Sequence, residues 1–149
     1  MNFTKKVIVA VGLSNDMATM LKPLHNMDFL SVSEVHFVHV FNTMNYTTVF
    51  SDFPIVYPVE TDLKGIDESV LAFLVKTSKE VLPTGFMGKV LHKCFFDPSP
   101  KDKFCDYVKE TNADLVIVPT REKRGVFESS FAQYVNKHTK SNMIILKKY

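Results

Sequence analysis

Residues 119–130, PTREKRGVFESS, carry the side chains of this sequence that are best suited to binding an anion. They follow the apolar run LVIVP and precede a segment with helical spacing. In α/β proteins a phosphate is bound by backbone N–H groups where a loop enters a helix, and glycines let the backbone approach closely. The candidate anion-binding or nucleotide-binding residues are Thr120, Arg121, Lys123, Arg124, Gly125, Ser129 and Ser130, with Gly12 and Ser14 from the turn GLSND at 12–16.

The same stretch has a second interpretation, which the sequence favours. Glu122 and Glu128 oppose the positive charge, and the chain contains neither a Walker loop nor a GxGxxG motif. A solvated basic loop, whose serines only cap the following helix, accounts for these residues without any ligand.

Composition limits the classes of protein that need to be considered. The 149 residues are 46% hydrophobic and 23% charged, as expected of one globular domain spanning 1–149. A formal net charge of +2 is too small to indicate a nucleic-acid or polybasic membrane surface. No apolar run approaches the roughly 18 residues of a membrane span. We therefore expect a cytoplasmic protein without nucleic-acid or membrane partners.

Short apolar runs that alternate with helical segments predict an α/β fold. The runs expected to form strands are 7–11, 35–41, 89–95, 115–119 and 143–146. Runs that are apolar at consecutive positions suit strands covered on both faces. Apolar residues at steps of three and four predict a helix after each of the first four strands, and Pro23 should kink the first of these helices.

This order predicts a single-domain, doubly wound, Rossmann-like parallel sheet with helices on both faces. Ligands of such sheets bind beyond the carboxyl ends of the strands, where the winding reverses. If the first and fourth strands are neighbours, residues 12–16 and 119–130 meet at that place.

The remaining side chains with chemical potential have structural interpretations. His36 and His39 are three apart on a predicted strand, so they lie on opposite faces and cannot jointly bind a metal. Cys94 and Cys105 form no CxxC motif and are expected to be reduced thiols. The chain has no Gly-x-Ser-x-Gly elbow for a nucleophile, and we expect neither a metal nor catalytic residues.

Two segments could contact other chains. Residues 42–60 carry several aromatic side chains, which either pack on the second helix or contact a protein partner. The final strand would leave unpaired backbone groups at a sheet edge, which favours a homodimer. The expected interface residues are Met143, Ile144, Ile145 and Leu146.

Several segments together resemble the universal stress protein family over nearly the whole chain. KKVIVAVGLSND at 5–16 resembles its first strand and turn, and VHFVHVF at 35–41 places His39 where the family often has Leu-His-Val. FFDPSPKDKFCDYVKETNADLVIVPT and SSFAQYVNKHTKSNMIIL resemble its later strands and helices. The resemblance implies a five-stranded parallel sheet in the order 3-2-1-4-5, dimerisation through the last strand, a cytoplasmic stress-response role and no established catalytic reaction.

The resemblance also implies a mode of ATP binding from which this sequence departs. ATP-binding members share a Gly-x2-Gly-x9-Gly-Ser/Thr loop and an acid in the first turn. Here Glu122 takes the place of a glycine in a loop three residues too short, and Gly12 takes the place of the acid. A carboxylate facing a polyphosphate is repulsive. We therefore expect a non-enzymatic, dimeric interaction or regulatory module without a cofactor; the alternative is a sensor that binds ATP or AMP through a modified loop 119–130.

Overall fold

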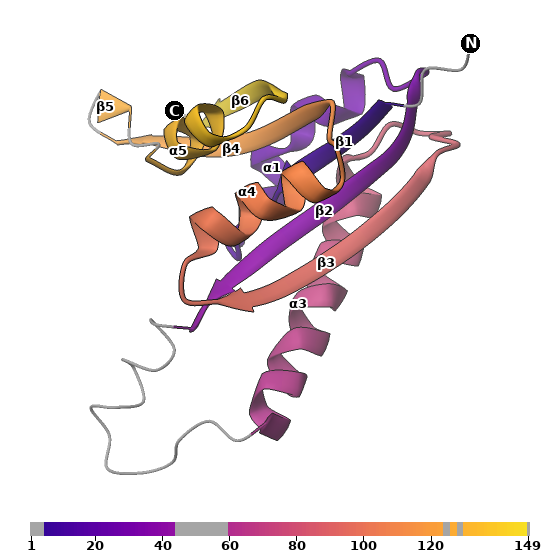
Figure 1. Ribbon diagram of the computed structural model, residues 1–149. Helices are drawn as coiled ribbons and strands as arrows, with labels where there is room; N and C mark the ends of the chain where they lie inside the picture. Colours follow the sequence, from indigo (N-terminus) through magenta and orange to yellow (C-terminus); the bar gives the residue numbers. More distant parts are fainter. Residues whose placement is uncertain (1–4, 44–59, 124–125, 128–129, 149) are drawn as a thin grey trace.

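A computed structural model of the chain describes residues 5–43, 60–123, 126–127 and 130–148. Its strands and helices follow the order predicted from the sequence (Figure 1). They are β1 (Lys5–Ala10), α1 (Met17–Met20), the 3-10 helix η1 (Lys22–Asn26), β2 (Val32–Asn42), α3 (Glu60–Val81), β3 (Lys89–Asp97), α4 (Pro100–Glu110), β4 (Leu115–Lys123), β5 (Val126–Phe127), α5 (Ser130–His138) and β6 (Asn142–Lys148).

The main sheet confirms the predicted topology. Its parallel strands lie in the order β3-β2-β1-β4-β6, because β1 pairs with both β2 and β4, β2 also pairs with β3, and β4 also pairs with β6. β6 is the fifth parallel strand along the chain, so the order is 3-2-1-4-5. The winding reverses between β1 and β4, and the carboxyl ends of these two strands therefore border the place where a ligand is expected.

Helices cover both faces of this sheet, as predicted (Figure 1). One apolar cluster joins α1, η1 and α3 to one face through Met17, Leu24 and Leu74. The other joins α4 and α5 to the opposite face through Phe104 and Val135. Alternate residues of β1 enter the two clusters, which explains why its apolar residues are consecutive in the sequence.

Local sequence explains where two of the helices begin or break. Pro23 lies in the first turn of η1, and the apolar stripe at 17–27 is divided into a short α-helix and a 3-10 helix. This division agrees with the predicted effect of Pro23. Helix α4 begins at Pro100, where a missing N–H costs nothing. Just before it, the Ser99 backbone N–H donates to Asp97 Oδ1 and the Ser99 hydroxyl donates to Asp102 Oδ2.

The prediction that the fourth strand ends at residue 119 is wrong. β4 continues to Lys123 and turns into an antiparallel pair with β5, so part of the expected loop 119–130 is a strand and a hairpin. The extension is stabilised by β6, which pairs with β4 as far as Arg121 and Lys148. Pro119 is tolerated because the pairing of β4 with β1 ends at Ile117.

Two further expectations meet the limits of the described chain. Of residues 42–60, the segment 44–59 lies outside the described residues, so its expected contacts stay a prediction. Within the described parts, no helix is both long enough and apolar enough to cross a membrane.

Candidate ligand-binding cavity

A cavity of about 560 Å³ lies at the carboxyl ends of β1 and β4, between helices from both faces of the sheet. Its volume is in the range that encloses small organic ligands. The apolar part of its wall includes Val11, Met17, Met20, Phe104, Val118 and Phe131. Its polar part consists of Ser14, His39, Thr120, Arg121 and Ser130.

Two hydroxyl groups of the cavity wall are buried and find no hydrogen-bond partner among the described residues. They are Ser14 Oγ, from the turn after β1, and Thr120 Oγ1, from β4. Thr120 is only 7% exposed, so water does not satisfy its hydroxyl from the outer surface. A buried polar group without a partner costs about 1–3 kcal/mol, which indicates that a ligand or an enclosed water completes these hydrogen bonds.

His39 adds an uncharged acceptor to the same wall. Its Nδ1–H donates to the carbonyl oxygen of Val11 at 2.7 Å, which leaves Nε2 without a proton in the neutral ring. Burial lowers the pKa of His39 below its ordinary value of 6.5, and the bond to Val11 opposes this shift only in part. At neutral pH the ring is therefore uncharged and can accept a hydrogen bond.

Arg121 and Asp16 form an ion pair beside the cavity. Arg121 Nη1 donates to Asp16 Oδ2 at 2.6 Å, and Nη2 donates to Oδ1. The bidentate pair connects the end of β4 to the residue before α1, and both side chains remain partly exposed. The two charges therefore neutralise one another at the cavity wall.

The structure brings together five of the nine predicted site residues. The five that line the cavity are Gly12, Ser14, Thr120, Arg121 and Ser130. Lys123 ends β4, and the direction of its side chain is not described. Arg124, Gly125 and Ser129 lie outside the described residues. Ser130 is the first residue of α5, and its hydroxyl accepts a bond from Lys101 Nζ at 3.4 Å.

Sequence reasoning did not identify Asp16 and His39 as residues of this site. Asp16 belongs to the turn 12–16, but its partner Arg121 is 105 positions away in the sequence. His39 was interpreted as structural, and its bond to Val11 supports that interpretation even though the ring also lines the cavity. The alternation of β2 was the available signal, since it places residue 39 on the face that α1 covers.

Gly12 leaves little room for a larger residue in this backbone. A Cβ atom at this position would lie 3.1 Å from Met17 Cε, which would have to move slightly to admit one. The acid that the family resemblance implies at this position is therefore replaced by a close contact between the turn and α1.

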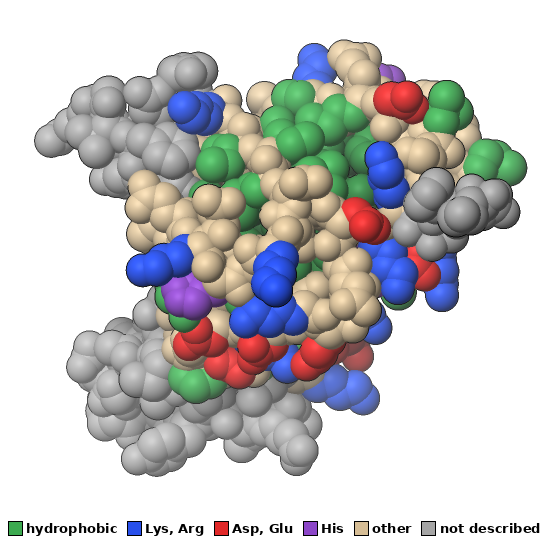
Figure 2. All heavy atoms as spheres, turned by 45° about the horizontal axis from the view of Figure 1, so that its top comes forward, with side chains coloured by type: hydrophobic (Ala, Val, Ile, Leu, Met, Phe, Trp, Pro, Cys, Tyr) green, Lys and Arg blue, Asp and Glu red, His purple; other side chains and the backbone are tan. Residues whose placement is uncertain are grey.

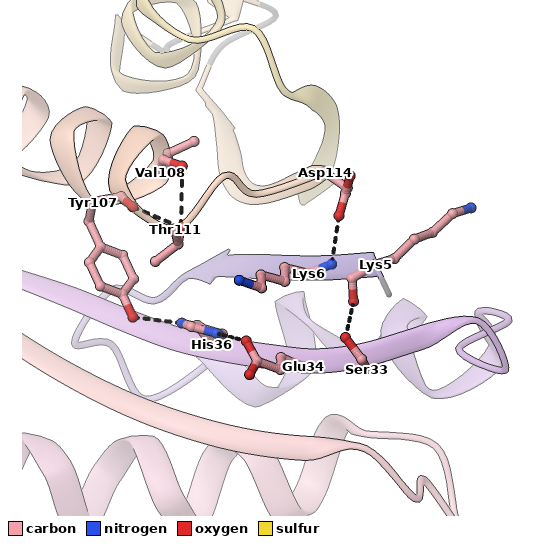
Figure 3. Close-up of polar contacts among 9 residues, drawn as sticks. All are labelled: Lys5, Lys6, Ser33, Glu34, His36, Tyr107, Val108, Thr111 and Asp114. Atoms are coloured by element: carbon pink, nitrogen blue, oxygen red, sulfur yellow. Dashed lines mark hydrogen bonds and ion pairs between the residues drawn. The ribbon is translucent and has the colours of Figure 1, made fainter. Parts of the chain in front are cut away.

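A second cluster of polar side chains lies between β2 and α4 (Figure 3). The Tyr107 hydroxyl of α4 donates to His36 Nδ1 at 2.6 Å, and His36 Nε2 donates to Glu34 Oε2 at 3.1 Å. His36 is 4% exposed and lies against the Tyr107 ring. The side chain of His36 thus packs with α4, whereas His39 faces the other side, which confirms the predicted opposite orientation.

The two thiols are placed as structural residues. Cys105 is buried in α4, and Cys94 is half-buried on β3. Burial, followed by the negative charge of Asp67, raises the pKa of Cys94 to about 12, so this thiol is not a nucleophile at neutral pH. Within the described ranges, no cluster of three or more His, Cys, Asp or Glu side chains could bind a metal.

The parallel sheet order and the cavity at its reversal point define an α/β protein with a doubly wound, Rossmann-like sheet. Comparison with known families is more specific, because the sequence model of the "Universal stress protein family" matches residues 4–147. The chain therefore belongs to the universal stress protein family. A search of curated protein sequences found no match.

Solved structures share the fold at low sequence identity. A hypothetical protein, PH0823, superposes with a TM-score of 0.72 at 18% identity, over 97% of this chain and 96% of that one. A universal stress protein in complex with cAMP gives 0.61 at 13% identity, over 97% of each chain. The universal stress protein from Archaeoglobus fulgidus in complex with dAMP gives 0.59 at 19% identity, over 99% of this chain and 100% of that one.

Proposed function

We propose that this chain is a non-enzymatic regulatory protein of the universal stress family that binds an adenine nucleoside or a close analogue in the cavity between β1 and β4. The observation that carries the proposal is a pair of buried hydroxyls in the wall of a ligand-sized cavity, Ser14 Oγ and Thr120 Oγ1, which have no hydrogen-bond partner within the described part of the chain. A nucleoside presents both donors and acceptors around a flat apolar ring, which suits such a wall.

The remaining lining supports a ligand of this chemistry. Met17, Met20 and Phe104 supply apolar surface, while His39 supplies a neutral acceptor. Two similar structures are universal stress proteins in complex with cAMP and with dAMP, and both ligands contain adenine. Together these points favour the nucleoside-binding alternative over a module that binds no ligand.

We propose further that ATP is not bound in the manner of the family's glycine-rich loop. The backbone of residues 119–121 pairs with Leu146–Lys148 of β6, so this part of the chain is a strand and not a loop that wraps around phosphates. Glu122, in place of a glycine, would add a negative charge to the same path.

The proposed regulatory unit is a homodimer joined through β6. This strand pairs with β4 on one side, and no other strand of the described residues pairs with its second side. Figure 2 shows apolar side chains gathered at the part of the molecule where β6 lies in Figure 1. An edge of this kind favours pairing with a second copy.

Substitution Thr120→Val tests the ligand site. It removes the unpaired hydroxyl while nearly preserving the shape of the side chain, so the melting temperature of the ligand-free protein should stay the same or rise. Adenosine should bind about three- to tenfold more weakly, since a lost hydrogen bond is worth about 0.5–1.5 kcal/mol. Isothermal titration calorimetry and thermal unfolding measure the two effects.

Thr111→Val is the matched control. The Thr111 hydroxyl donates to the carbonyl oxygens of Tyr107 and Val108, so this variant should lose about 1 kcal/mol of stability and keep its affinity for adenosine. The proposal is wrong if wild-type protein gives no saturable heat with adenosine, or if Thr120→Val binds adenosine as tightly as wild type.

A further inference from the structure

We propose that the ion pair between Asp16 and Arg121 makes the cavity selective for uncharged ligands, so that it accepts a nucleoside in preference to the corresponding phosphate. This inference rests on the proposed function, since it specifies which form of the ligand the same cavity accepts.

The ion pair reaches the polar part of the cavity wall through Arg121. Arg121 is the part of the described cavity wall that carries a positive charge, and it is 44% exposed. Both of its terminal nitrogens donate to the two carboxylate oxygens of Asp16. A guanidinium group that is engaged by a bidentate carboxylate has already used the donor geometry with which it would bind a phosphate.

A phosphate could reach Arg121 only by displacing Asp16 or by lying beside it. Displacement breaks two charge-assisted hydrogen bonds, and proximity sets two anions against each other in a partly enclosed space. An uncharged nucleoside meets neither cost. Selectivity of this kind arises from a repulsive element built into the site as much as from an attractive one.

At the nearby start of helix α4, hydrogen-bond donors are likewise engaged by carboxylates of the protein. Pro100, its first residue, lines the cavity and has no N–H to offer. The Ser99 backbone N–H donates to Asp97 Oδ1, and its hydroxyl donates to Asp102. The chain's own carboxylates thus occupy donors at this helix start that would otherwise favour an anion.

The test compares adenosine with AMP in wild type and in Asp16→Asn. The variant keeps the size of the side chain and frees Arg121 from its carboxylate. The Asp16 side chain makes no capping hydrogen bond to α1, so the helix start should tolerate the change. We expect AMP to bind about tenfold more tightly to Asp16→Asn than to wild type, with adenosine affinity changed by less than about twofold.

Three further variants test whether the freed Arg121 causes the gain in AMP affinity. Asp106→Asn makes the same change of charge on the exposed side of α4 and should leave the affinities for AMP and adenosine unchanged. Asp16→Asn/Arg121→Gln should lose the gain in AMP affinity. Asp16→Asn/Lys101→Gln should keep the gain, since the side-chain amine of Lys101 donates to Ser130. Thermal unfolding of each variant verifies that it is folded.

The possible failures are distinguishable. Tighter binding of AMP than of adenosine by wild type overturns the selectivity, as does an unchanged ratio of the two affinities in Asp16→Asn; in both cases nucleoside binding stands. The selectivity is also overturned if Asp16→Asn/Arg121→Gln keeps the gain in AMP affinity. If adenosine binds neither wild type nor any variant, the proposed function is wrong and the selectivity falls with it.

Discussion

Glu34 makes the stability of this chain depend on pH. The hydrogen bond from His36 lowers the pKa of the Glu34 carboxyl below its ordinary value of 4.5. A group whose pKa is lower in the folded state stabilises the fold above the pKa of the unfolded chain, and this contribution is lost as the pH falls through the folded value. Burial raises the pKa of Tyr107, which keeps its hydroxyl protonated as the donor to His36.

We therefore expect Glu34→Gln to be less stable than wild type at pH 7 by about 0.5–1 kcal/mol, because the partly exposed carboxylate loses its charge-assisted hydrogen bond from the neutral His36 ring. The difference should shrink as the pH falls from about 4.5 toward 3, because wild type then loses the same charge. Urea unfolding at several pH values measures it. A difference that stays constant from pH 7 to pH 3 would exclude this explanation.

At the scale of single residues, the sequence predicted which residues line the site better than it predicted which side chains interact. Ser14 follows β1 and Thr120 lies toward the carboxyl end of β4, so simple topology placed both hydroxyls in the site. The pairing of Arg121 with Asp16 could not be predicted, because it depends on how far β4 extends beyond the sheet centre. Arg121, a candidate for binding an anionic ligand in the sequence, is thus paired with a carboxylate of the protein.

At the scale of elements, two glycines respond oppositely to substitution by alanine. A Cβ atom at Gly88, just before β3, would lie 2.8 Å from the backbone carbonyl oxygen of Ser33 and would also meet the Phe86 ring. Gly88→Ala should therefore cost about 1–3 kcal/mol. Gly65 lies in α3, and among the described residues nothing beyond its chain neighbours and its own helix backbone comes within 4 Å of such a Cβ, so Gly65→Ala should stabilise by about 0.5–1 kcal/mol.

Chemical denaturation of both variants measures these changes in the free energy of unfolding. Equal effects of the two substitutions would show that the close approach of β3 to Ser33 does not limit stability. The comparison needs no ligand, and so it is independent of the proposed site.

Elements with a strong apolar period were predictable, and those that depend on a neighbour were not. The strands near 7–11, 35–41 and 143–146 all formed, because continuous apolar runs must be covered on both faces. The extension of β4 through Thr120 and Arg121 is polar, and only its pairing with β6 makes it a strand. The hairpin with β5 has no hydrophobic period to reveal it, since β5 has two residues.

At the scale of the whole molecule, the β6 edge is the proposed dimer interface. Ile145 is 37% exposed, and its strand neighbours are only partly buried. Ile145→Lys would place a charge in the interface and should convert the dimer to a monomer. Static light scattering at tens of micromolar protein measures the mass.

Met87→Lys is the control for that experiment. Met87 is 95% exposed between α3 and β3, so the substitution also replaces an exposed apolar side chain by lysine but does so away from β6. The molecular mass measured by light scattering should therefore be unchanged. A wild-type mass of one chain would refute the dimer, and a dimer that survives Ile145→Lys would place the interface elsewhere.

Helix α1 connects the two proposed surfaces of the molecule. Met17 and Met20 form part of the cavity wall, and the same short helix contacts β6. An occupant that fixes these methionines would also restrain the strand that a second subunit adjoins. Any such coupling is reciprocal, so a change in subunit association on nucleoside binding requires an equal change in nucleoside affinity on assembly.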